Sequence, residues 1–151
     1  MTLKPLAALV AAAGLALAPA AFAADKVSAE AYKAEKDKIA AEYKAEVQRC
    51  DSQTGNAKDI CKAEAKGKEK SAKADAEAHY KGTAKAQADA RIAHADADYD
   101  VAKEKCDELT GNKKDVCVKD AKAAHTKAKA DAKVARSANE QRNEGAKPGR
   151  S

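Results

Sequence analysis

Residues 50–61 read CDSQTGNAKDIC and residues 106–117 read CDELTGNKKDVC, so one short motif occurs twice in the chain. All four cysteines of the protein lie at the ends of these two segments. The flanking sequence is repeated as well, because residues 43–76 align without a gap with residues 99–132 and about half of the aligned positions are identical. We infer an internal duplication in which each position recurs 56 residues later.

Each copy of the motif predicts a helix, a tight turn and a second helix. Ala, Lys and Glu, which have high helix propensity, are frequent on both sides of the motif. In the Thr-Gly-Asn sequence, the glycine can take the left-handed conformation that ends a helix, and the asparagine is a good N-cap for the next one. The aspartate three residues later resembles the partner in a capping box. The predicted turn and cap residues are Gly55, Asn56 and Asp59 in the first copy, and Gly111, Asn112 and Asp115 in the second.

The cysteines lie at equal distances from each predicted turn. Positions equidistant from the turn of an antiparallel helical hairpin are level with each other, so Cys50 should face Cys61, and Cys106 should face Cys117. Four cysteines allow three pairings, and this geometry favours the two local disulfides. In the chain-entropy model, closing a loop of about 12 residues contributes roughly 3 kcal/mol of stability.

Metal and redox sites are the alternatives for these cysteines. Structural zinc sites usually contain cysteine pairs separated by two to four residues, and redox-active or haem-attachment sites contain Cys-x-x-Cys, whereas here ten residues separate the cysteines of a pair. His94 lies near Asp96, Asp98 and Asp100, but residues at spacings of two cannot share one side of a helix, which favours a solvated face. We therefore predict structural disulfides, with no metal site, no cofactor and no catalytic residues.

Apolar and small residues predict how the helices pack. In the second copy, residues at alternating spacings of three and four form a heptad seam: Ile92, Ala95, Tyr99, Ala102, Cys106 and Leu109. A stripe of small residues after the turn is predicted to face this seam: Cys117, Ala121, Ala124, Ala128 and Ala132. The first copy retains only Ile39, Tyr43 and Cys50 of the corresponding seam. The predicted fold is all-α, with two tandem disulfide-stapled antiparallel hairpins at residues 24–82 and 83–138, packed as a four-helix bundle or an elongated coiled coil. We expect that the weak seams can also join copies into a homo-oligomer.

The two ends of the chain have other compositions. Residues 1–23 have the features of a cleaved secretory signal peptide: Lys4, an apolar run at 6–18, and small residues leading to a cleavage site after Ala23. The run is shorter than the roughly 20 residues that span a bilayer, which favours a signal peptide over a membrane anchor, and no later segment is more apolar. Export to a periplasm would supply the oxidising environment that disulfides need. Residues 139–151 contain no apolar residue except Ala and are predicted to be disordered.

The charge pattern argues against nucleic-acid binding. The net charge is +5 and 35% of the residues are charged, but lysines alternate with acidic residues along the chain. Glu69 and Lys73, like Glu77 and Lys81, are spaced i,i+4 with the acid first, an arrangement that stabilises helices. A nucleic-acid-binding protein would instead concentrate basic residues on one face.

The residues above resemble a known group of proteins. A signal peptide, YKAEKDKI at 32–39, and the doubled motif Cys-Asp-x-x-Thr-Gly-Asn-x-Lys-Asp-(Ile/Val)-Cys are similar to those of small exported proteobacterial proteins often labelled TolA-like cell-envelope proteins. The resemblance implies a non-enzymatic structural or interaction role in the cell envelope, with a protein or envelope partner. The Ala/Lys/Glu-rich composition supports an alternative, a stress protectant similar to late-embryogenesis-abundant proteins. The stapled hairpins favour the envelope role, because solvating protectants rarely need disulfides.

Overall fold

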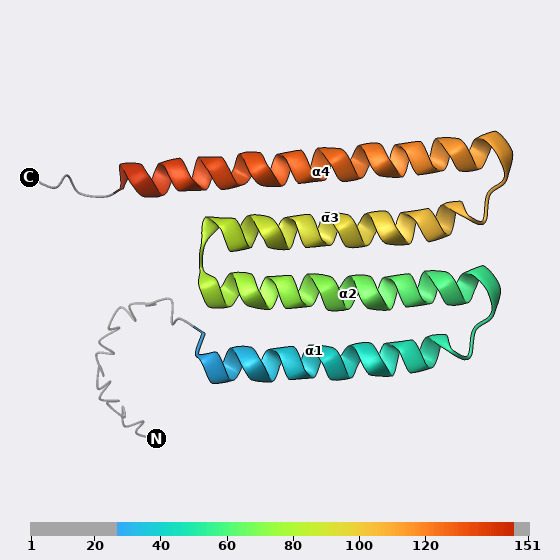
Figure 1. Cartoon of the computed structure of the whole chain (residues 1–151), viewed down its shortest axis with the longest axis horizontal. Helices are drawn as coiled ribbons and strands as arrows, with labels where there is room; N and C mark the ends of the chain where they lie inside the picture. Colours follow the sequence, from blue (N-terminus) through green and yellow to red (C-terminus); the bar gives the residue numbers. More distant parts are fainter. Residues whose placement is uncertain (1–26, 147–151) are drawn as a thin grey trace, which may run out of the picture.

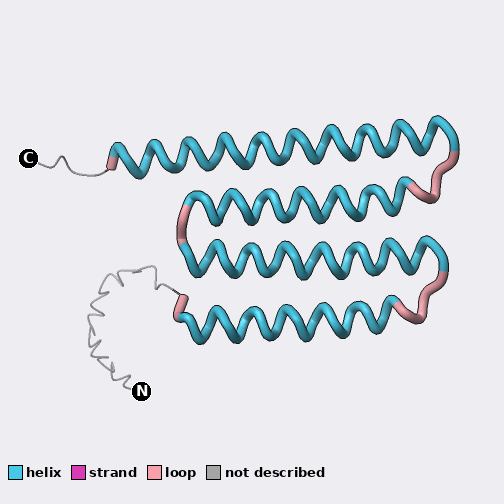
Figure 2. The backbone as a smooth tube through the Cα atoms, in the orientation of Figure 1, coloured by secondary structure: helices cyan, strands magenta, loops and turns pink. Residues whose placement is uncertain are grey.

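The computed structural model describes residues 27–146, which form four α-helices and no strand (Figures 1 and 2). The helices are α1 (Ala29–Cys50), α2 (Gly55–Lys81), α3 (Ala84–Cys106) and α4 (Gly111–Gly145). The prediction of an all-α protein built from two tandem antiparallel hairpins is confirmed. The predicted signal peptide and its cleavage site after Ala23 lie outside the described residues.

The four helices lie side by side, in chain order, as a single antiparallel layer (Figure 1). Within residues 27–146, α1 packs against α2, α2 against α3, and α3 against α4, and no other pair of helices is in contact. A four-helix bundle would bring α1 against α4, so that form of the prediction is wrong. The physical reason is the shortage of large apolar side chains, because a bundle has a central core that alanines cannot fill.

Helix α3 lies in the middle of the layer and is apolar on two opposite sides. Its buried residues are Ala86, Ala88, Ala90, Ala93, Ala95, Ala97 and Cys106. At 100° per residue, Ala86, Ala90 and Ala97 share the side that faces α2, and Tyr99 and Cys106 share the opposite side, which contacts α4. The heptad seam of the second copy is therefore used inside the chain, between α3 and α4.

The contact between α2 and α3 is close because the facing residues are small. A Cβ atom built on Gly67 would lie 3.0 Å from the Cβ of Ala97, so a larger residue at this position would push the two helices apart. Ala74 and Ala78 of α2 pack against Ala86 and Ala90 further along the same contact.

The turns within the two hairpins differ from the prediction. Gly55 and Gly111 do have left-handed backbones, with φ of 56°, but each begins the second helix instead of ending the first. The N-cap positions are occupied by Thr54 and Thr110, whose side chains make no capping hydrogen bond. The reason is that the first helix of each hairpin already ends at its cysteine, so the residues that follow the cysteine cross to the next helix.

The cap predictions for the residues after the glycine are consequently wrong. Asn56 and Asn112 lie inside the first turn of α2 and α4 and are not N-caps, and Asp59 and Asp115 take part in no capping box. Side-chain caps occur elsewhere, because the backbone N–H of Ala31 donates to Ser28 Oγ and that of Ala86 donates to Thr83 Oγ1, each at 3.1 Å.

Helix α4 is longer than predicted. It continues through residues 139–145, which the sequence assigned to a disordered tail, and that part of the prediction is wrong. Arg136 donates to Glu140 at 2.7 Å, and Arg142 donates to Asn139, so side-chain pairs within the helix support its last turns. Residues 147–151 lie outside the described part of the chain. Among the described residues, no helix is long and apolar enough to cross a membrane.

Candidate interaction surface

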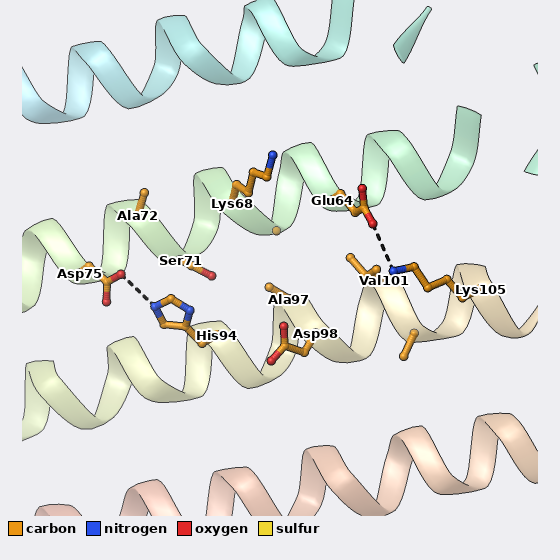
Figure 3. A pocket seen from close by; sticks show the side chains of 12 residues that line it. Glu64, Lys68, Ser71, Ala72, Asp75, His94, Ala97, Asp98, Val101 and Lys105 are labelled. Carbon is orange, nitrogen blue, oxygen red and sulfur yellow. Dashed lines mark hydrogen bonds and ion pairs between the residues drawn. The ribbon is translucent and has the colours of Figure 1, made fainter. Parts of the chain in front are cut away.

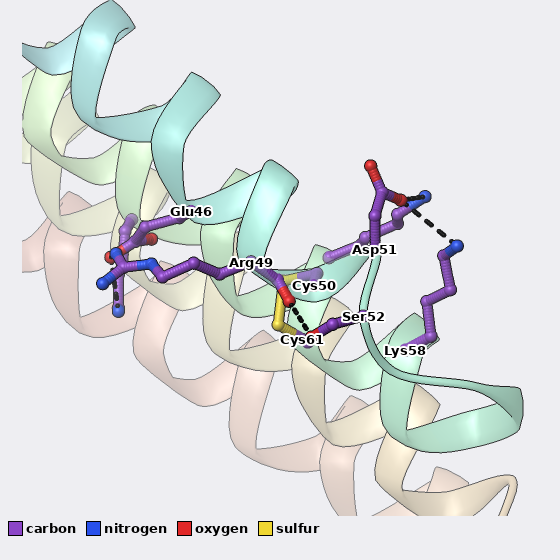
Figure 4. Close-up of a disulfide and its surroundings, with 9 residues drawn as sticks. Glu46, Arg49, Cys50, Asp51, Ser52, Lys58 and Cys61 are labelled. Carbon is purple, nitrogen blue, oxygen red and sulfur yellow. Dashed lines mark hydrogen bonds and ion pairs between the residues drawn. A yellow bond between two sulfur atoms is a disulfide. The ribbon is translucent and has the colours of Figure 1, made fainter.

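The two disulfides form as predicted, Cys50 with Cys61 (Figure 4) and Cys106 with Cys117. The Cα atoms of each pair are 5.5 Å and 5.7 Å apart, within the usual range for a disulfide. The sulfur-bearing side chains of Cys50 and Cys106 are fully buried. Each disulfide joins the last residue of one helix to the second turn of the next, and so fixes one end of each hairpin.

An ion pair of the repeated motif closes each turn, a role that the motif did not reveal from sequence alone. Asp51 accepts from Lys62 at 3.1 Å and from Lys58 at 3.2 Å, and hydrogen bonds from these two lysines lower the pKa of the Asp51 carboxyl (Figure 4). In the second copy, Lys114 donates to Asp107 at 2.9 Å, and this hydrogen bond raises the pKa of Lys114. Since Lys58 and Lys114 occupy equivalent positions, the Asp and Lys of the motif have the same role in both copies.

Stacked aromatic rings strengthen both hairpins at points away from the disulfides. The rings of Tyr32 and Tyr80 are 4.6 Å apart and nearly parallel, and they close the open end of the α1–α2 hairpin. Between α3 and α4, the ring of Tyr99 stacks on His125 at 4.7 Å. Tyr99 therefore lies in a helix contact, as the heptad seam of the second copy predicted.

The contact between α3 and α4 departs from the predicted stripe of small residues. Cys117, Ala121 and Ala132 lie toward α3, but Ala124 and Ala128 are exposed. His125 takes the intervening place against α3, stacked on Tyr99. At this point the stripe shifts by one residue, since the His125 ring stacks on Tyr99 and also contacts Asp96.

One face of the layer carries a groove of about 730 Å³ between α2 and α3 (Figure 3). Its apolar walls come from small residues: Gly67, Ala72, Ala97, Val101 and Ala102. Ion pairs bridge the two helices at each end of this groove, with Lys105 Nζ 3.2 Å from Glu64 and His94 Nε2 2.8 Å from Asp75. Lys68, Ser71 and Asp98 add polar groups between the two bridges. We call this feature the α2–α3 groove.

The opposite face carries a charged cluster centred on Asp96. Its carboxylate lies 2.6 Å from His125 Nε2 and accepts from Lys70 at 3.1 Å and from Lys129 at 3.3 Å. Partial burial alone would raise the pKa of Asp96, but the hydrogen bonds from His125, Lys70 and Lys129 outweigh it and lower the pKa to about 2. The cluster links α2, α3 and α4, and its lysines and histidine come from the two helices that flank α3.

The structure separates the His94 and Asp96 side chains, as their spacing of two residues predicts. His94 lies on the groove face and Asp96 on the opposite face. Asp96 is nevertheless half-buried, so the prediction of a solvated face is wrong at this residue. In the part of the chain that the structure describes, no three His, Cys, Asp or Glu side chains are placed to hold a metal ion together.

A second groove, of about 580 Å³, lies on the face opposite the α2–α3 groove. It crosses three helices, and its walls are mostly charged: Tyr43 and Val47 from α1, Asp59, Lys62, Ala63 and Lys66 from α2, and Asp100, Lys103 and Glu104 from α3. The two faces of the layer therefore differ in character, one more apolar and one more charged.

No protein-family model matches this chain, and neither does any curated protein or solved structure.

Proposed function

We propose that this protein is a non-enzymatic, exported component of the bacterial cell envelope, with a structural or interaction role. The observation that supports this proposal best is the single-layer arrangement, in which each helix contacts only its neighbours along the chain. Both faces of α2 and α3 consequently stay open to partners. Repeat proteins of this kind, in which each unit contacts only the next, typically use their extended surfaces for binding.

The disulfides support the location. Both disulfides lie within hairpins, and such bonds persist in oxidising compartments such as a periplasm. The predicted signal peptide at residues 1–23 and the resemblance to exported cell-envelope proteins agree with this location. The staples also keep each hairpin rigid, so a partner binds without the cost of ordering the helices.

The α2–α3 groove is the surface that we assign to a partner protein. Its two bridging ion pairs are separated by the span from Glu64 to Asp75, about 16 Å along α2 at 1.5 Å per residue. Small side chains between the bridges leave room for an apolar side chain of the partner, and the charged rim can pair with polar groups on either side of it. A short helical or extended segment with one apolar anchor fits this arrangement.

Site-specific photocrosslinking in intact envelopes tests this function. A photoreactive amino acid replaces Val101 in the α2–α3 groove, and a matched variant carries it at Lys103, two residues along α3 and on the opposite face. We expect a small, reproducible set of products from position 101 that is absent from position 103. Labelling of the same broad set of abundant proteins from both positions would overturn the proposal and favour a protectant that contacts many clients weakly.

A further inference from the structure

The contact between α2 and α3 joins the two copies of the repeat. Because equivalent positions are 56 residues apart, α3 corresponds to α1, and α4 corresponds to α2. The α2–α3 contact is therefore the joint between one repeat and the next. Its defining contacts are Gly67 against Ala97, Glu64 with Lys105, Asp75 with His94, and the Asn56 side-chain amide, which donates to the backbone oxygen of Glu104 at 3.1 Å.

The same two surfaces recur, without a neighbour in the chain, at the two edges of the layer. In the internal joint, one side of α3 faces α2. Among the described residues, the equivalent side of α1 has no helix against it, and its residues are all exposed: Ala34, Asp37, Ala41 and Ala45. Likewise, one side of α2 faces α3. The equivalent side of α4 is exposed and contains Asn112, Ala123, Lys127, Ala130 and Val134. We call these the α1 edge and the α4 edge.

The α4 edge carries exposed apolar side chains, of which Val134 is the most exposed. Its side chain is 69% exposed, whereas the equivalent residue Ala78 is 7% exposed in the joint between α2 and α3. Val116, on the same side of α4, is 47% exposed. Two of the most exposed large apolar side chains of the described residues therefore lie on one edge helix.

The charges at the two edges are complementary when they are matched as in the internal joint. In the internal joint Glu64 pairs with Lys105. The equivalent of Glu64 one repeat later is Asp120 of α4, and the equivalent of Lys105 one repeat earlier is Arg49 of α1, so an acid and a base are retained.

Two further positions follow the same rule. The Asp75–His94 pair becomes Asp131 with Lys38, again an acid on α4 and a base on α1. At the centre of the joint, the equivalents of Ser71 and Ala93 are Lys127 and Asp37, which add an opposite-charge pair that the internal joint lacks.

The asparagine and some of the small residues are retained too, because Asn56 becomes Asn112, and Ala97 and Ala90 become Ala41 and Ala34. Gly67 becomes the larger Ala123 and Ala86 becomes Glu30, so the two edges would lie further apart than α2 and α3 do. The Lys70–Asp96 pair is the one cross-helix pair of the internal joint whose charges are lost, because its equivalents are Thr126 and Ala40.

We propose that copies of this protein associate head to tail, with the α4 edge of one copy packed against the α1 edge of the next in the register of the internal joint. Such a contact joins two different surfaces, so it does not close on itself at the dimer and continues the layer into a longer array. The heptad seams play no part in this association, because they already pack inside each chain. The proposal goes beyond the proposed envelope role and holds whether or not the α2–α3 groove binds another protein.

Sedimentation analysis of the purified, oxidised protein tests the proposal. The protein is exported by a bacterial host and studied alone over a wide concentration range. We expect its average mass to rise with concentration past the dimer. A protein that stays monomeric at millimolar concentration, or one that stops at the dimer, would overturn the proposal.

Charge reversal shows which surfaces are involved. Reversing the α4 edge (Asp120→Lys with Asp131→Lys) or the α1 edge (Lys38→Glu with Arg49→Glu) should weaken association about tenfold, since two attractive surface pairs become repulsive. Mixing the two variants restores opposite charges at every junction and should restore association. Failure of the mixture to associate, while circular dichroism shows that both variants are folded, would contradict the assigned edges.

A matched control separates edge pairing from net charge. Glu108→Lys with Glu144→Lys changes the net charge as much as the α4-edge variant does, at exposed positions outside the matched pairs. This control should associate like the unmodified protein. An equal loss in the control would show that net charge alone governs association, which would also contradict the proposal.

Discussion

Removing a disulfide should destabilise the protein by an amount that follows from the length of the loop that the disulfide closes. Replacing Cys50 and Cys61 together by alanine opens a loop with a sequence separation of 11, and the second disulfide closes a loop of the same length. The chain-entropy model gives about 3 kcal/mol for each loop of this size. Since a small domain has roughly 5–15 kcal/mol of total stability, each staple contributes a substantial part of the stability of so thin a layer.

The two disulfides should have different local effects despite their equal loops. Of the three helix pairs, α1 and α2 share the smallest contact. Loss of the Cys50–Cys61 bond should therefore release α1 from the layer before α2 and α3 separate. Loss of the Cys106–Cys117 bond should have a smaller local effect, because Tyr99, His125 and the Asp96 cluster still hold α4 against α3.

Urea unfolding followed by circular dichroism measures the global effect, and amide hydrogen exchange measures the local one. With a denaturant slope of about 1–2 kcal/mol per molar, a loss of 3 kcal/mol lowers the urea midpoint by roughly 2 M. Chemical reduction of the unmodified protein provides the control, because it should lower the midpoint as much as replacing all four cysteines by alanine. A midpoint that shifts by less than about 0.3 M in both double variants would refute the role that we assign to the staples.

Substitutions at three further positions test other parts of the structure. Gly67→Val should destabilise the α2–α3 contact by about 1–3 kcal/mol through overpacking against Ala97. Gly67→Ala should cost less, because alanine has a helix propensity about 1 kcal/mol better than that of glycine, which offsets part of the overpacking. Thermal melts of the two variants check this order of stability. Asp96→Asn should cost about 1–2 kcal/mol at neutral pH. The pKa of Asp96 is lower in the folded state than in the unfolded state, so the Asp96 carboxylate stabilises the fold above about pH 4, and this stabilisation is lost as the pH falls toward 2. The urea midpoints of the unmodified protein and of the Asp96→Asn variant should therefore converge at low pH. A difference between the two midpoints that stays constant with pH would count against the stabilising role of the cluster. Gly55→Ala should cost about 1–2 kcal/mol because of its positive φ, with Gly55→Asn less harmful, and equal melting temperatures for the two variants would contradict this reading.

The sequence was sufficient to predict the helices and the disulfide of each hairpin. The spacing of Cys50 and Cys61 about the turn predicted the disulfide, and the glycine of the motif predicted a left-handed residue. The exact turn was not predictable, because the helix before it ends at Cys50, and this end depends on how the disulfide holds the two helices. The asparagine after the glycine then falls inside α2, where it bonds to α3.

The packing of the hairpins was less predictable. Heptad spacing identified the side of α3 that contacts α4, but not the second apolar side, formed by Ala86, Ala90 and Ala97, because alanines are frequent everywhere in this sequence. The groove and the Asp96 cluster depend on that second contact, since both combine residues of α2 and α3. A sequence pattern dominated by alanine thus predicts where the helices lie in the chain, but not which helices pack against each other.

The alanine-rich contacts have a thermal consequence. Most of the buried apolar side chains are alanines, so unfolding exposes little apolar surface for each residue of the chain. The heat capacity change of unfolding grows with that surface, and we expect it to fall below the usual value of about 12–15 cal/mol/K per residue. A small heat capacity change flattens the dependence of stability on temperature. The protein should therefore retain nearly the same stability from cold to warm conditions and should melt over a broad range of temperature.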